Sequence, residues 1–169
     1  VGGKQSKDRF IFVVNKLDGR NPEDGDTDQT LDKVRSYLKT HGVSNPNLFP
    51  ASALPALNIR LINSGAEVDE ETRDDTEVKV KKLNRKERKD ANGQPLKPLH
   101  FETYASLPPS LRGEINGQLE STRLGWEGRD SENPNEALIH TGIVSIEAAI
   151  RQYVQKYAKT AKIKNIVDT

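Results

Sequence analysis

The chain has 169 residues, and its 26 lysines and arginines nearly balance 25 aspartates and glutamates, giving a formal net charge of +1. This balance offers no general electrostatic reason to bind nucleic acid, and the absence of cysteine excludes disulfides, thiolate metal sites and thiol nucleophiles. No stretch approaches the roughly 18 consecutive apolar residues of a membrane-spanning helix, so an integral membrane protein is excluded and a cytoplasmic location is expected.

The first predicted elements form a strand, helix, strand unit. Residues 10–14 are an unbroken run of β-branched and aromatic residues, which predicts a strand covered on both faces, as in parallel sheets. Apolar residues at helical spacing over 31–38 predict an amphipathic helix, with Thr27 or Asp28 as its N-cap. Residues 48–51 predict a second short strand in the same sheet. This order of elements favours an α/β fold.

After the second strand the pattern becomes helical. Apolar residues over 57–62 predict one helix. Residues 67–90 follow with acidic residues first and basic residues last, which complements a helix dipole and predicts a long solvated helix that stops at Asn92-Gly93. The basic run 79–89 is a candidate membrane-binding or nucleic-acid-binding patch. Its acidic neighbours favour a solvent-exposed helical face instead.

The last third of the chain changes from irregular to helical. Prolines and glycines interrupt residues 95–136, where one helix is predicted at Ser110–Leu119. Apolar residues then share one helical face over three turns from Ile146 to Tyr157, with Ser145 as the expected N-cap.

The motif that carries chemistry is Asn15-Lys16-Leu17-Asp18, directly after the first strand. Ligands in open parallel sheets bind at the carboxyl ends of strands. There, the Asp18 carboxylate can accept hydrogen bonds from the ring N–H and the amino group of guanine, a pair of donors that adenine lacks. Lys16 would lay its methylene stem along the base, and Asn15 would tie this loop to a neighbouring one. The alternative is a polar turn in which Asp18 starts a bend before Gly19.

This tetrapeptide resembles the guanine-specificity motif of P-loop GTPases, which is Asn or Thr, Lys, any residue, Asp. That family carries a second loop after the next strand, usually with Ser-Ala, whose alanine N–H contacts the guanine O6. Ser52-Ala53 follows the second predicted strand here. The resemblance implies GTP or GDP as the ligand, with Asn15, Lys16, Asp18, Ser52 and Ala53 as its binding residues.

Within that superfamily the sequence is similar to the dynamin-like large GTPases, of a bacterial kind. The similarity covers residues 8–62 and 138–160. It includes the return His140-Thr141-Gly142-Ile143 into the last predicted helix, and the long segment before that return favours a large GTPase with an insertion. It implies GTP hydrolysis coupled to assembly or membrane remodelling, with self-association through the GTPase domain and peripheral membrane contact.

The implied organisation is a partial GTPase domain over residues 1–169. Residues 8–56 would be the guanine-binding βαβ part, at the trailing end of a Rossmann-like P-loop GTPase sheet. Residues 57–137 would be a helical and irregular insertion, and residues 138–160 the closing helix.

The chain departs from this family at the phosphate site. No G-x-x-x-x-G-K-[ST] occurs, and Gly2-Gly3-Lys4 has neither the spacing nor the following hydroxyl residue. The chain also lacks methionine, which would fit either a removed initiator before Val1 or an excised piece of a longer protein. Because the motifs present all resemble the C-terminal half of a GTPase domain, an excised piece is expected. The phosphate cradle and the ligands of Mg²⁺ would then lie outside it. No catalytic residue is assigned, and the chain alone is not expected to hydrolyse GTP.

The histidines at 41, 100 and 140 are far apart without ligand spacing, so no metal site is expected from them. The alternative function is a non-catalytic interaction or scaffold module that retains a GTPase-like half-sheet.

Overall fold

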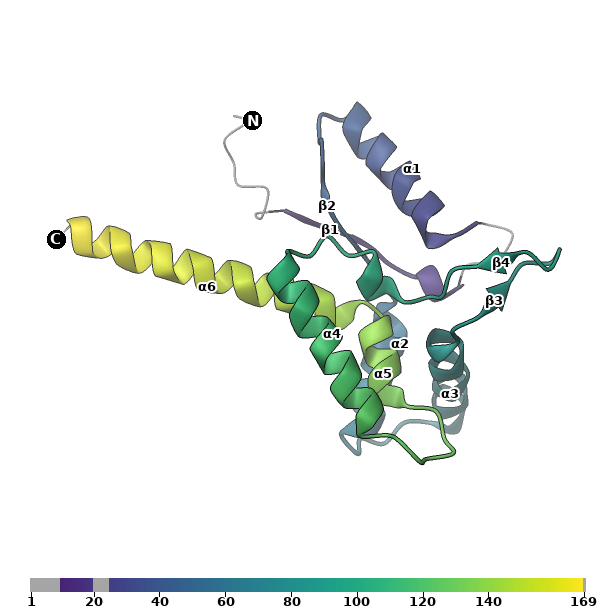
Figure 1. Ribbon diagram of the computed structural model, residues 1–169. Helices are drawn as coiled ribbons and strands as arrows, with labels where there is room; N and C mark the ends of the chain where they lie inside the picture. Colours follow the sequence, from purple (N-terminus) through teal and green to yellow (C-terminus); the bar gives the residue numbers. More distant parts are fainter. Residues whose placement is uncertain (1–9, 20–24, 169) are drawn as a thin grey trace.

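A computed structural model describes residues 10–19 and 25–168 as an α/β fold that is mostly helical (Figure 1). The segment Gly2-Gly3-Lys4 lies outside these residues. In chain order the elements are β1 (Ile11–Val14), the 3₁₀ helix η2 (Leu17–Gly19), α1 (Thr27–Thr40), β2 (Asn47–Pro50), α2 (Ala53–Asn63), α3 (Glu70–Asn84), β3 (Arg88–Lys89), β4 (Pro95–Leu96), the 3₁₀ helix η4 (Phe101–Thr103), α4 (Pro109–Leu124), α5 (Pro134–His140) and α6 (Ile143–Asp168).

The predicted strand, helix, strand unit is confirmed. β1 and β2 pair in parallel, with Phe12 opposite Leu48 and Val13 opposite Phe49, and α1 connects them. Figure 1 shows α1 lying beside these two strands. The sheets of the described residues are this pair and the short antiparallel pair of β3 and β4, so a larger Rossmann-like sheet is not seen there.

The prediction that the first strand is covered on both faces is wrong. Val13 is 49% exposed and the adjoining Phe10 is 55% exposed, whereas Ile11 and Val14 pack against core clusters, so the described residues cover the strand only in part. β2 differs, since Leu48 and Phe49 are buried. The segment after η4 covers β2, where the Ser106 N–H donates to the Leu48 carbonyl and the Ser106 hydroxyl accepts from the Leu48 N–H, both at 3.0 Å.

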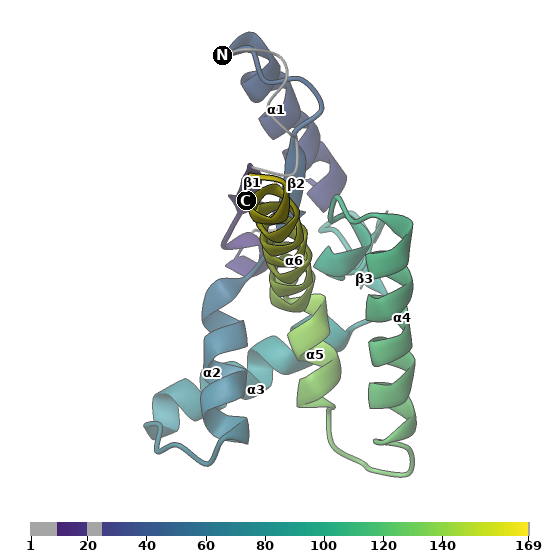
Figure 2. The ribbon, with the colours of Figure 1, turned by 90° about the vertical axis from the view of Figure 1, so that its left-hand side faces the viewer.

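The helices after β2 form a layer in which α5 is central. α5 contacts α2 and α3 on one side and α4 on the other (Figure 2). The largest core cluster joins Leu17 of η2 to Ile59 of α2, Val80 and Leu83 of α3, and Phe101 of η4. This cluster fixes the loop after β1 onto the helical layer.

α6 leaves this layer and extends away from it (Figure 1). Its predicted apolar face is buried only at the start, since Ile146 is buried whereas Val154 and Tyr157 are exposed. No helix among the described residues is both long enough and apolar enough to cross a membrane.

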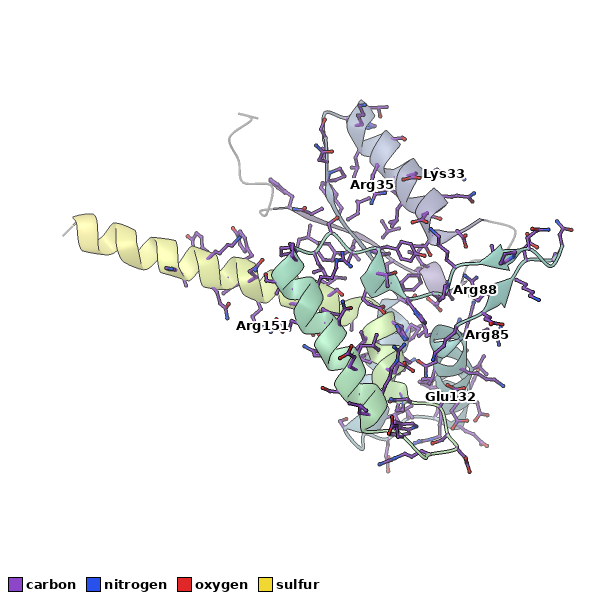
Figure 3. The ribbon with its side chains drawn as sticks, in the orientation of Figure 1. Lys33, Arg35, Arg85, Arg88, Glu132 and Arg151 are labelled. Atoms are coloured by element: carbon purple, nitrogen blue, oxygen red, sulfur yellow. The ribbon has the colours of Figure 1, made fainter. Side chains whose placement is uncertain are left out.

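The predicted long helix over 67–90 is confirmed over most of its length, but residues 85–90 are not helical. α3 begins after the N-cap Asp69 and ends at Asn84, where Arg85 turns to extended backbone. Arg85 and Arg88 then lead into the hairpin of β3 and β4 (Figure 3). Asn92 lies in the hairpin turn, where the Asp90 carboxylate accepts its N–H at 2.8 Å. A polar turn of this kind competes with a helix for the backbone N–H groups.

Other predicted boundaries also shift. The N-cap of α1 is Asp26 rather than Thr27 or Asp28. The predicted helix over 110–119 is confirmed but longer, and α5 was not predicted. α6 begins at Ile143, so Ser145 is a buried residue of its first turn and not its N-cap.

Candidate functional site

The loop after β1 and the loop after β2 lie side by side, because the carboxyl ends of neighbouring parallel strands meet at one edge of a sheet. The Asp18 N–H donates to the Ser52 hydroxyl oxygen at 3.0 Å. The Ala53 N–H donates to Asn15 Oδ1 at 2.9 Å, so Asn15 ties its loop to the neighbouring loop as the sequence predicts. With Lys16 between them, all five residues selected from the sequence are brought together.

Ser52 is completely buried behind this edge. Its N–H donates to the Thr141 carbonyl at 2.9 Å, while its hydroxyl receives the Asp18 N–H. A residue without exposed surface cannot touch a ligand that arrives from solvent. Ser52 therefore positions Asp18 and links the two loops to the segment between α5 and α6.

Lys16 holds an unusual backbone conformation. Its φ is +65°, in the left-handed region that residues other than glycine rarely adopt. Such strain concentrates at ligand-binding sites, where the surrounding structure enforces it. The Lys16 carbonyl accepts the Gly19 N–H at 3.3 Å, which closes a tight turn and leaves the Lys16 side chain exposed.

The carboxylate of Asp18 has a cationic neighbour from α3. Lys79 Nζ lies 2.9 Å from Asp18 Oδ2, and the two side chains are 23% and 12% exposed. Burial raises the pKa of Asp18, but the hydrogen bonds from Lys79 and Ser52 outweigh it, so the net pKa lies below its usual value. Asp18 is therefore ionised at neutral pH.

A second lysine of α3 contacts the same residue. Lys82 Nζ donates to the Asp18 backbone carbonyl. Burial and the nearby charge of Lys79 lower the pKa of Lys82. The sequence assigned both lysines to a solvent-exposed face, which is wrong for these two. Their spacing of three residues places them on one side of a helix, but no sequence pattern shows which loop that side meets.

The structure also assembles a buried cluster that the sequence did not indicate. His140 Nδ1 lies 2.7 Å from Glu102 Oε1, and the His100 and His140 rings stack with centroids 3.6 Å apart and an angle of 6°. His100, Glu102 and His140 thus offer three potential ligand atoms within 4.8 Å of one another. However, the lone pairs of stacked imidazoles lie in parallel planes, so both rings cannot coordinate one ion without a ring rotation.

His100 should make the stability of the fold sensitive to acid. Burial, followed by the charge of His140, lowers the pKa of His100 from 6.5 to about 3. Between these values the unfolded chain binds a proton that the folded chain excludes, so stability should fall as the pH drops from 6.5 towards 3. At ~1.4 kcal/mol per pKa unit, the whole shift would correspond to about 5 kcal/mol of stability. Because the ring is partly exposed, the expected loss is smaller, ~2–3 kcal/mol.

Urea unfolding at pH 7, 5 and 4 measures this effect. His100→Gln should flatten the pH dependence relative to the wild type, whereas the exposed His41→Gln serves as the matched control and should leave it unchanged. If the free energy of unfolding changes with pH equally in the wild type and in His100→Gln, His100 is not responsible for the acid sensitivity.

Comparison with protein-family models, curated protein sequences and solved structures gave no significant match.

Proposed function

We propose that this chain forms the guanine-recognising part of a GTPase domain, and that the whole protein binds and hydrolyses GTP with Mg²⁺. One observation carries the proposal: the Asp18 carboxylate and the Ala53 N–H lie on two hydrogen-bonded loops at the carboxyl ends of neighbouring parallel strands. The sequence motifs alone would not require these two groups to meet.

The two groups match complementary edges of guanine. The ring N–H and the exocyclic amine of guanine are donors, which suit the ionised Asp18, and its O6 is an acceptor, which suits the Ala53 N–H. Ala53 is also the first residue of α2, and the positive end of a helix dipole favours an oxygen there. Adenine would place an amino group against the Ala53 N–H and would offer no ring N–H to Asp18, so both contacts disfavour it.

The remaining residues of the two loops have supporting roles in this proposal. Lys16 is exposed and lies two residues before Asp18, so its methylene stem can cover one face of the base. Ser52 holds the two loops in register through its bond to the Asp18 N–H, while Asn15 accepts the Ala53 N–H in the absence of nucleotide and releases it to the O6 of the base. The phosphates and Mg²⁺ are held by residues other than these 169, because the chain contains no phosphate-binding motif.

We also propose that β1 and β2 belong to a larger Rossmann-like sheet, that of a dynamin-like GTPase. The support for this is the unpaired edge of β1 among the described residues, next to the exposed Val13, where further strands of such a sheet would add. Self-association, assembly and membrane contact follow from the resemblance and are proposed on that basis.

Calorimetric titration of the intact gene product with GDP and with ADP, each with Mg²⁺, tests the proposal. GDP should bind at least ~100-fold more tightly than ADP, because ADP leaves both buried polar contacts unmatched. Equal affinities, or no nucleotide binding by the folded protein, would favour the scaffold module instead.

A further inference from the structure

Both groups that the proposed function assigns to guanine already have partners within the chain. The Lys79 ammonium lies 2.9 Å from the Asp18 carboxylate, and the Ala53 N–H donates to Asn15 Oδ1 at 2.9 Å. Asp18 as a whole residue is only 8% exposed. A base cannot make either contact in this arrangement without displacing a partner.

Lys79 and guanine present the same chemistry to Asp18. Each supplies N–H donors, and guanine needs both carboxylate oxygens because its two donors lie side by side on one edge. Lys79 takes Oδ2, while the completely buried Ser52 lies behind the residue and accepts the Asp18 N–H. The side that Lys79 approaches is therefore the side on which the base would have to arrive.

We propose that α3 is an internal latch on this site, in which the Lys79 ammonium holds the place at Asp18 that the donors of guanine take when nucleotide binds. This inference rests on the proposed function and adds a regulation of the same site. Nucleotide binding and the position of α3 are coupled, because the base and Lys79 cannot occupy that place together.

The latch is attached to the motif at more than one point. Lys82 Nζ donates to the Asp18 carbonyl, and Val80 and Leu83 pack with Leu17 in the largest core cluster. Residues 17 and 18 of the motif therefore contact the same helix in three ways: apolar packing, a hydrogen bond from a lysine side chain to the Asp18 carbonyl, and an ion pair. A displacement of α3 must change the motif loop, and a change in that loop must reach α3.

The ion pair is suited to release. The pair is largely buried, so the Asp18 carboxylate needs a replacement partner when Lys79 leaves, whereas the ammonium of Lys79, the more exposed side chain at 23%, can regain water. A base that makes two aligned hydrogen bonds to the carboxylate replaces one such pair with a stronger arrangement. The expected result is a site that stays closed without nucleotide and opens at a modest cost in affinity.

Nucleotide affinity in the intact gene product tests the latch. Lys79→Gln removes the competing charge and should raise GDP affinity about tenfold. ADP affinity should stay unchanged, so the ratio of GDP to ADP affinity should rise by the same factor. Lys81→Gln is the matched control, since it is the same change on an exposed position of α3, and it should leave GDP affinity unchanged. If wild type and Lys79→Gln bind GDP equally, the latch is wrong and the guanine site stands. If no variant binds GDP, the proposed function fails and the latch fails with it.

A second readout needs no nucleotide. Carboxyl ¹³C NMR of the 169-residue chain follows the ionisation of Asp18. Lys79→Gln should raise the pKa of Asp18, because it removes a hydrogen bond and a charge that lower it, whereas Lys81→Gln should not. An Asp18 pKa that is the same in the wild type and in Lys79→Gln would overturn the latch, whatever the nucleotide titrations show.

Discussion

Asp18→Asn should change the base that the intact protein prefers, from guanine to xanthine. An amide presents one donor and one acceptor, whereas guanine offers two donors to this residue. Xanthine carries a carbonyl in place of the amino group next to the ring N–H, so it offers one acceptor and one donor and matches the amide. The loss of GDP affinity should be at least ~100-fold, since a charge-assisted hydrogen bond is lost and a donor is left facing a donor.

Competition titrations with GDP and xanthosine diphosphate measure this change. Asp32→Asn is the matched control, because it is the same substitution at an exposed position of α1, where Asp32 forms a surface pair with Arg35. Asp32→Asn should keep the wild-type preference. If Asp18→Asn also keeps GDP affinity, Asp18 does not contact the base.

Gly142→Ala should destabilise the fold strongly. Gly142 links α5 to α6 with a φ of +81°, and a Cβ built there would lie 2.2 Å from the Pro50 carbonyl oxygen, at the end of β2. A non-glycine residue in this region costs ~1–3 kcal/mol, and the steric overlap with rigid backbone adds ~1–3 kcal/mol. The free energy of unfolding should therefore fall by roughly 2–6 kcal/mol.

Urea unfolding followed by circular dichroism gives this number. Gly117→Ala is the matched control, since Gly117 lies within α4 with no atom within 4 Å of an added Cβ. Alanine favours a helix over glycine, so the control should gain ~0.5–1 kcal/mol. A Gly142→Ala variant as stable as the control would show that the close approach of Gly142 to β2 is absent in solution.

The local patterns predicted the elements near the motif well. The β-branched run, the apolar spacing of α1 and the second short strand gave β1, α1 and β2 nearly in their observed places. These signals are local, since they depend on residues a few positions apart. The predicted tie from Asn15 to a neighbouring loop is also confirmed, because parallel neighbouring strands end at the same edge, although its partner Ala53 was expected to contact the base instead.

The predictions that were wrong concern features that depend on contacts between distant segments of the chain. The order of acidic and basic residues over 67–90 could not show that α3 ends at Asn84. The hairpin that follows is stabilised by the side chain of Asp90 in its turn. Nor could this order of charges show that Lys79 meets Asp18, since that contact depends on how α3 packs against η2. The burial of His100 against His140 is equally non-local.

If Asp18 and Ala53 contact a guanine base, GDP must perturb both residues, and amide NMR of the ¹⁵N-labelled chain detects such a perturbation. Chemical shifts detect millimolar binding, so the 169-residue chain can be used without phosphate contacts. We expect GDP to shift the Asp18 and Ala53 amides while leaving Gly117 in α4 unchanged, and ADP to shift neither at the same concentration. Unchanged amides with GDP, or equal shifts with ADP, would contradict these contacts with guanine.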